Sequence, residues 1–142
     1  MRAKEYLEQI SMIKIKIKLK RENIEELKGT IEGVKGLEIS ERVQTSPKGD
    51  PIGDSVIRLE RLESELNDYI EKYDKKYKEI MSTMEELTNK DYYNVLYRRY
   101  VLEQSWEQIA VNMNYTSRGT QKLHGRALQE IEKILKSVRT CS

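Results

Sequence analysis

The hydrophobic positions in the first third of the chain recur at alternating steps of three and four residues. This spacing places them along one stripe of an α-helix, as in a coiled coil. The stripe has a single polar member, Lys20. The pattern predicts a first long helix over residues 3–34, whose stripe comprises Ile10, Ile13, Ile17, Lys20, Ile24, Leu27, Ile31 and Val34.

Residues 13–19, inside this helix, alternate strictly between apolar and basic side chains, and such alternation is typical of a β-strand. The sequence on both sides is rich in helix-forming residues and lacks helix breakers, so we expect one continuous helix with apolar residues on two faces. Ile15 and Leu19 then need a second surface to bury against. A second copy of the chain would supply it, and we therefore expect a homo-oligomer, with a dimer favoured.

Residues 35–55 contain both prolines and several glycines, which predicts a loop between two helices. A second hydrophobic stripe predicts a helix over residues 56–87, with a stutter between Tyr73 and Tyr77 that relaxes the supercoil. Neither long helix can bury its stripe alone. We expect residues 1–88 to form a helical hairpin that serves oligomerisation or protein contact; the role of loop 35–55 stays open.

The last third of the chain has the local signals of shorter helices. Asn89 is a suitable cap for a helix that ends near residue 100. Ser105, followed three residues later by Gln108, is a capping box that opens a helix over residues 106–113. Asn114 tolerates the left-handed conformation of a tight turn, and Ser117 is expected to cap a further helix to about residue 135. Residues 89–142 therefore predict a domain that contains a helix-turn-helix.

A helix-turn-helix places its second helix in the major groove of DNA. The expected core of the motif comprises Ile109, Met113, Tyr115, Leu123 and Leu128, with the small Ala110 where the helices cross. The second helix repeats a basic side chain every four residues and has no acidic residue from 117 to 129. Its candidate DNA-binding residues are Ser117, Arg118, Thr120, Gln121, Lys122 and Arg126.

Each of these side chains suits a particular contact. Arg118 and Gln121 can read guanine or adenine. Lys122 and Arg126 suit phosphate, and Ser117 or the helix end it caps can also take a phosphate oxygen. Three residues depart from the usual motif: Asn114 stands where Gly is common, and Gly119 and Gly125 each cost a helix interior about 1 kcal/mol.

The distribution of charge along the chain also points to its C-terminal part as the DNA-binding part. Residues 89–142 hold nine Lys and Arg against five Asp and Glu, whereas residues 1–88 hold 17 against 19. The net charge of +2 is too small to indicate nucleic acid by itself. A second basic run, from Lys14 to Arg21, is interpreted as a solvated face, with a further DNA or polymerase contact as the alternative.

The remaining chemistry is sparse. The single cysteine, Cys141, and the single histidine, His124, predict no metal site and no cofactor, and we expect His124 to pack or hydrogen-bond on its helix. There is no phosphate loop, nucleophile elbow or metal-ligand cluster, so we do not expect an enzyme. No segment has the pattern of a signal peptide or a membrane span, and one thiol fits a reducing compartment, so we expect a cytoplasmic protein without a membrane partner.

Three segments resemble the C-terminal DNA-binding region 4 of bacterial sigma factors: residues 96–100, residues 105–110 and residues 123–128. More closely, the chain is similar over nearly its whole length, the linker at 41–46 included, to a family of small phage and prophage proteins of Gram-positive bacteria. These carry a sigma-like helix-turn-helix behind a helical N-terminal half. The resemblance implies an all-α protein that binds double-stranded DNA as a phage-type transcriptional regulator, similar to activators of late genes. It leaves RNA polymerase open as a second partner.

Two other functions fit the same pattern. Small terminase subunits also join a helix-turn-helix to oligomerising helices, and they recognise DNA for genome packaging. A helical adaptor whose C-terminal end binds another protein, without DNA affinity of its own, is the alternative of a different class. A ring of many copies would favour the role in genome packaging, and absence of DNA binding would favour the helical adaptor.

Overall fold

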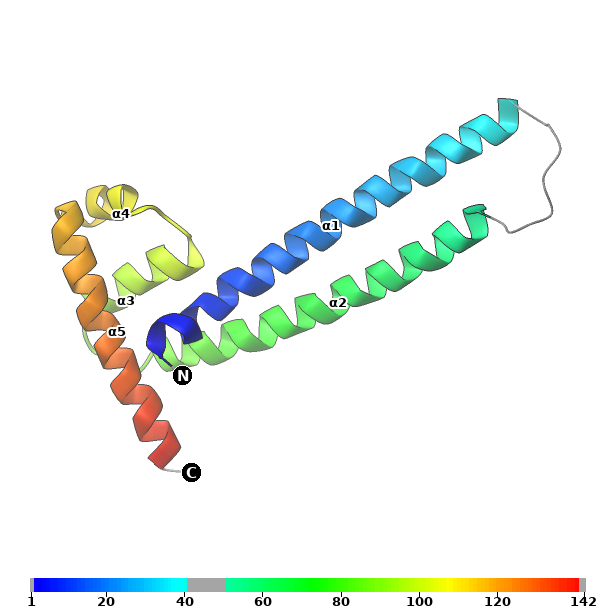
Figure 1. Cartoon of the computed structure of the whole chain (residues 1–142). Helices are drawn as coiled ribbons and strands as arrows, with labels where there is room; N and C mark the ends of the chain where they lie inside the picture. The colour runs from blue at the N-terminus through cyan, green and yellow to red at the C-terminus, as the bar shows by residue number, and fades with distance from the viewer. Residues whose placement is uncertain (1, 41–50, 141–142) are drawn as a thin grey trace. The chain divides into compact units, whose positions relative to one another are not determined.

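The computed structural model describes residues 2–40 and 51–140 (Figure 1). The described residues contain no strand, and 89% of them are helical, so the expected all-α class is confirmed. Residues 13–19 are helical despite their strand-like alternation. The elements in chain order are α1 (Ala3–Ser40), α2 (Pro51–Met84), α3 (Lys90–Leu96), the π-helical turn η1 (Tyr97–Val101), α4 (Trp106–Met113) and α5 (Ser117–Thr140).

The long helices extend further into the expected loop than the sequence pattern predicted. Helix α1 continues through Gly36 to Ser40, and α2 begins at Pro51 rather than near residue 56. A proline is tolerated in the first helical turn, because its missing N–H would have no partner inside the helix. Residues 41–50, which include the linker segment of the resemblance, lie outside the described residues. Helix α5 also runs to Thr140 rather than to about residue 135.

The chain divides into two compact units, one formed by Met1–Ile13 with Tyr73–Ser142 and the other by Lys14–Lys72. This division differs from the boundary expected after residue 88. The physical reason is that the first turns of α1 and the last turns of α2 share a hydrophobic core with the C-terminal helices. Its buried members include Leu7, Ile10, Ile80, Met84, Val95, Leu96, Ile109, Leu123 and Ile131.

Polar contacts within the first unit follow the same grouping. The Tyr6 and Thr83 hydroxyls are 2.9 Å apart, and the Ser11 hydroxyl donates to a Glu103 carboxylate oxygen at 2.5 Å. Glu103 takes a left-handed conformation, with φ 56°, which is unusual for a residue with a side chain. These bonds join α1 to α2 and to the segment that precedes α4.

In the unit of residues 14–72, α1 and α2 lie side by side (Figure 1). Ile24 and Ile31 of α1 and Leu62 of α2 are buried. Lys20, the polar member of the first stripe, places its Nζ 2.7 Å from Glu65 Oε2. Solvent screens an ion pair whose carboxylate is exposed, so the apolar side chains supply most of the stability of this pairing.

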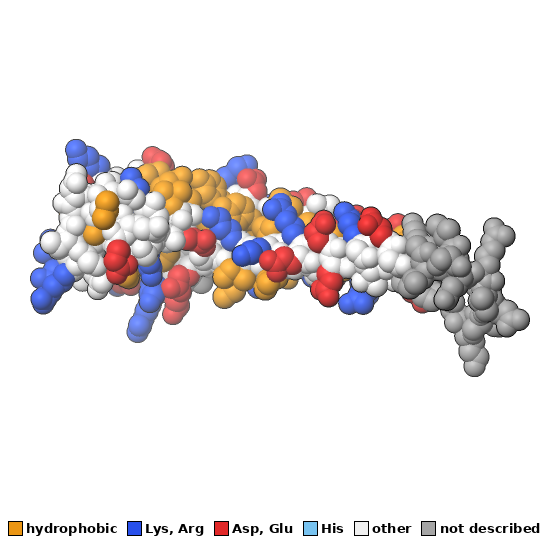
Figure 2. All heavy atoms as spheres, turned by 90° about the horizontal axis from the view of Figure 1, so that it is seen from above, with side chains coloured by type: hydrophobic (Ala, Val, Ile, Leu, Met, Phe, Trp, Pro, Cys, Tyr) orange, Lys and Arg blue, Asp and Glu red, His pale blue; other side chains and the backbone are white. Residues whose placement is uncertain are grey.

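The second apolar face of α1 has no partner among the described residues that buries it. Ile15 is 52% exposed and Leu19 is 57% exposed. Figure 2 shows hydrophobic side chains at the surface beside Lys and Arg side chains. Burial of this face by a second copy of the chain stays a prediction. None of the helices in the described part is both long and apolar enough to cross a membrane.

Candidate nucleic-acid interface

Helix α4 begins with the expected capping box. The Ser105 hydroxyl accepts a hydrogen bond from the Gln108 backbone N–H at 3.2 Å, and the Gln108 side-chain oxygen accepts one from the Ser105 N–H at 2.9 Å. Both bonds use backbone donors that a helix N-terminus leaves without internal partners. The box therefore determines where α4 begins.

The turn after α4 is closed by backbone hydrogen bonds. Asn114 has φ 58° and ψ 43°, in the left-handed region, as expected for the residue that stands where Gly is common. The Tyr115 N–H donates to the Ala110 carbonyl at 2.9 Å, which is the hydrogen bond of a Schellman motif. This arrangement satisfies a helix-end carbonyl and turns the chain sharply toward α5.

The cap of α5 is Thr116, not Ser117 as the sequence suggested. The Thr116 hydroxyl accepts from the Gly119 N–H at 2.9 Å, and Ser117 is the first helical residue. A Cβ added at Gly119 would lie 2.9 Å from Thr116 Oγ1. The close approach of the capping hydroxyl explains why a glycine stands at position 119. Contact of an anion with the helix end beside Ser117 stays a prediction.

The buried side of α5 packs on α3 and α4. Ile109, Ala110 and Leu123 are buried, and Met113 and Leu128 are half-buried against the same core, as expected. Tyr115 is an exception, because it is 38% exposed. Its hydroxyl donates to Asp91 Oδ2 at 3.2 Å, so its place at the surface is explained by a polar partner on α3.

Thr120 was expected among the DNA-binding residues, and its side chain cannot reach a ligand from its position. It is fully buried, and its hydroxyl donates to the Thr116 carbonyl at 2.8 Å. Thr120 therefore belongs to the core face of α5. Ser117 is half-exposed at the start of the helix.

Four of the expected residues share the open side of α5. Arg118, Gln121, Lys122 and Arg126 are all exposed. None of them forms a hydrogen bond or an ion pair with another described residue. Arg118 and Arg126 are about 12 Å apart along the helix axis, which is similar to the width of the major groove. Gly125 lies on this face as well, and a Cβ added there would meet nothing within 4 Å.

His124 occupies the edge of the core next to this face. Its Nε2 is 2.7 Å from the Tyr100 hydroxyl, and its ring meets the Trp106 ring edge-on, with centroids 4.8 Å apart. Burial, with the positive charges of Arg99 and Lys4, lowers the pKa of His124 to about 4. Burial raises the pKa of Tyr100 to about 12. The imidazole is therefore neutral at pH 7, and it packs the helix as expected.

Arg99 links the π-helical turn to α4. Its guanidinium lies 4.2 Å from the centre of the Trp106 ring and donates to the Gln104 carbonyl at 3.0 Å. Trp106 is half-buried against the core, so it anchors the start of α4 there. A π-helical turn often marks a functional position; here it orients Tyr100 and Arg99 toward His124 and Trp106.

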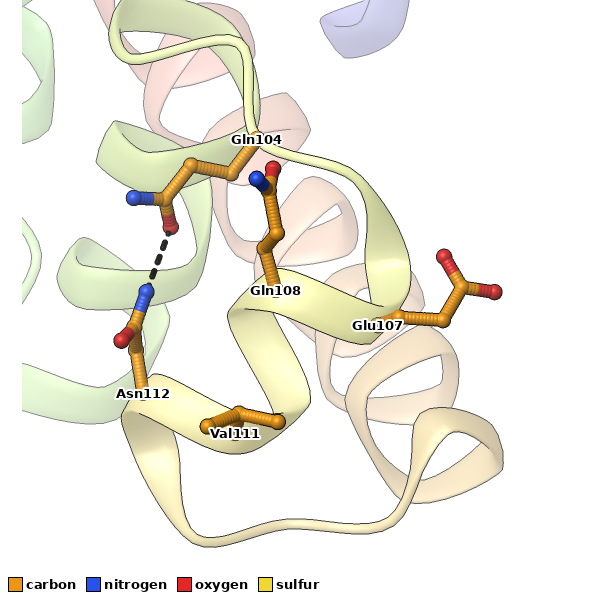
Figure 3. A pocket seen from close by; sticks show the side chains of 5 residues that line it. All are labelled: Gln104, Glu107, Gln108, Val111 and Asn112. Atoms are coloured by element: carbon orange, nitrogen blue, oxygen red, sulfur yellow. Dashed lines mark hydrogen bonds between the residues drawn. The ribbon is translucent and has the colours of Figure 1, made fainter.

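A shallow hollow on α4 was not expected from the sequence. It has a volume of about 390 Å³ and is lined by Gln104, Glu107, Gln108, Val111 and Asn112 (Figure 3). The Asn112 amide donates to the Gln104 side-chain oxygen at 3.1 Å, whereas Val111 is 77% exposed.

Within the described ranges, no group of three or more His, Cys, Asp or Glu residues could hold a metal ion. No protein-family model matches the chain, and no curated protein or solved structure matches it either.

Proposed function

We propose that the chain binds double-stranded DNA, with α4, the turn and α5 forming a helix-turn-helix and α5 entering the major groove. The observation that carries this proposal is the open face of α5. Arg118, Lys122 and Arg126 are exposed basic side chains without an ion-pair partner in the described part of the chain. Guanidinium and ammonium groups on one exposed helix face can donate hydrogen bonds to phosphate oxygens and to acceptors on base edges.

The way in which α5 is held supports the same function. Its buried face is anchored by Leu123, Ala127 and Ile131, and its first turn is capped by Thr116. A capped and packed helix presents its exposed side chains in one geometry, which reduces the ordering cost of binding. In the proposed contact, Arg118 and Gln121 read base edges, whereas Lys122 and Arg126 bind phosphate.

The role we propose for this DNA binding is transcription regulation of the phage type. It rests on the resemblance of residues 96–100, 105–110 and 123–128 to sigma factor region 4. The regulator would dock on promoter DNA in the bacterial cytoplasm, with RNA polymerase as a candidate second partner and a dimer as the favoured state. A ring of many copies, measured by native mass spectrometry, would instead support a small-terminase-like role in genome packaging.

One observation favours the protein adaptor as a second candidate. Val111 is 77% exposed beside the α4 hollow, and a hydrophobic side chain at such a position suits burial by another protein. If the chain has no affinity for DNA, this hollow is the first surface to test for a protein partner.

Fluorescence anisotropy with labelled duplex DNA across a salt series tests the DNA proposal. The variant Arg118→Ala with Lys122→Ala should bind about 10- to 100-fold more weakly than the wild type, and the slope of log affinity against log salt should fall by about one to two. The matched control is Arg58→Ala with Lys28→Ala, which removes the same charge from exposed positions on α2 and α1.

The outcomes separate the candidates. A loss of affinity in the α5 variant that the control does not share supports the proposed face. An equal loss in both variants would mean that only net charge matters. Absence of binding to random duplexes and to duplexes from the neighbouring genome at low salt overturns the proposal in favour of the adaptor.

A further inference from the structure

The unit of residues 14–72 carries a cluster of lysines around one aromatic ring. The ammonium groups of Lys16, Lys20 and Lys72 lie 6.0, 5.8 and 5.4 Å from the centre of the Tyr69 ring. Beside them is a hollow of about 240 Å³, lined by Lys16, Leu19, Lys20, Asn23 and Tyr69. Helices α1 and α2 both contribute to it.

Helical geometry brings these residues together. Lys16 and Lys20 are one turn apart on α1, and Tyr69 is four residues after Glu65 and three before Lys72 on α2, so each set shares a face. The alternating lysines of α1 do not all point the same way. At about 100° per residue, Lys14 and Lys18 lie on the other side of the buried stripe.

The positive charge of the cluster is only partly balanced. Lys20 pairs with Glu65 at 2.7 Å, and this hydrogen bond and charge hold the pKa of the Glu65 carboxyl below its usual range. Lys16 and Lys72 have no ion-pair partner among the described residues. Their contacts with the face of the Tyr69 ring are weak attractions that leave both positive charges in place.

The arrangement favours an anion. Because all three ammonium groups lie within 6.0 Å of the centre of the Tyr69 ring, no two of them are more than about 12 Å apart. The Debye length at physiological salt is about 8 Å, so salt weakens their mutual repulsion but does not remove it. An ammonium group has three donors and no acceptor, so a phosphate oxygen at the hollow satisfies donors and reduces the repulsion. A lysine binds phosphate as a point charge and does not read bases as a planar arginine does.

We propose that Lys16, Lys20 and Lys72 around Tyr69 form a second DNA contact, which binds a backbone phosphate independently of base sequence. The identity of the polyanion as DNA rests on the proposed function, whereas the site itself is separate from α5. It assigns a role in binding to a part of the chain that the helix-turn-helix does not use.

The test measures binding of the full chain to a random duplex across a salt series. In Lys16→Ala with Lys72→Ala, we expect the slope of log affinity against log salt to fall by about 0.9 for each phosphate that the variant no longer binds. The exchange of both lysines for Arg should retain the slope. The matched control is Lys28→Ala with Lys75→Ala, which removes two exposed lysines from the same helices. Circular dichroism confirms that every variant is folded.

The same measurement in the Arg118→Ala, Lys122→Ala background distinguishes this inference from the proposed function. Residual binding that falls further when Lys16 and Lys72 are also replaced supports the second contact, even if α5 contributes little. Variants at Lys16 and Lys72 that behave as the control does, while the α5 variant loses affinity, overturn the second contact and leave the proposed function intact. No binding by the wild type overturns both.

Discussion

Replacement by alanine is expected to affect the free energy of unfolding differently at the two glycines of α5, Gly119 and Gly125. Gly125 lies on the exposed face, and a Cβ added there meets nothing within 4 Å. Alanine in an exposed helix interior is favoured over glycine by about 0.8–1.0 kcal/mol. Gly125→Ala should therefore raise the free energy of unfolding by about 1 kcal/mol, which corresponds to a rise in Tm of about 2–4 °C for a chain of this size.

At Gly119 the new Cβ would lie 2.9 Å from the Thr116 hydroxyl oxygen that caps the helix. The hydroxyl has to move, and loss of an N-cap costs about 0.5–2 kcal/mol, which offsets the gain in helix propensity. The β-branched Thr116 has few side-chain conformations to adopt instead. We expect Gly119→Ala to give a result between no change and a loss of about 1 kcal/mol.

Trp106 provides the assay, because it is the single tryptophan and lies in the same compact unit as α5. Urea and thermal unfolding followed by its fluorescence report on this unit directly. If both alanine variants stabilise it equally, the role assigned to the Thr116 cap is wrong. If Gly125→Ala is destabilising, the open space above Gly125 is filled in solution. A stabilised Gly125→Ala that binds DNA more weakly would indicate close approach of DNA to this helix.

Three further predictions concern other parts of the chain. The pKa of His124 is lowered to about 4 in the folded chain, below the value near 6.5 of an unfolded chain. As the pH drops from 6.5 toward 4, the unfolded state therefore binds a proton before the folded state does, and the free energy of unfolding should fall. After allowance for solvent screening of a partly exposed ring the loss is about 1–2 kcal/mol; urea titrations at several pH values should show it in the wild type and not in His124→Gln. Asn114→Ala should cost about 1–2 kcal/mol, because Asn114 is left-handed at φ 58°, whereas Asn114→Gly should be close to neutral in the same unfolding assay. If a second copy covers Ile15 and Leu19, Ile15→Glu with Leu19→Glu should convert the oligomer to monomer in analytical ultracentrifugation without loss of helicity, and an unchanged mass would exclude this face as the interface.

Local sequence patterns were sufficient to predict the helices and the structure of several of their ends. The three-four spacing of apolar residues predicts α1 and α2, and the pairing of Ser105 with Gln108 predicts the start of α4, because both are interactions within a few turns of one helix. The left-handed Asn114 and the exposed basic face of α5 were predicted for the same reason. The DNA contact itself stays a proposal.

Contacts between distant segments, in contrast, could be found only in the folded chain. Thr120 was expected at the DNA-binding surface and is buried, whereas Tyr115 was expected in the core and is 38% exposed. Both differences arise because the neighbours of these side chains come from the packing of α5 against α3 and α4. The core that joins the ends of α1 and α2 to the C-terminal helices likewise depends on contacts between residues more than 70 positions apart, such as Tyr6 with Thr83. Periodicity along the chain cannot supply such contacts, since it records which face of a helix is apolar and not what covers it.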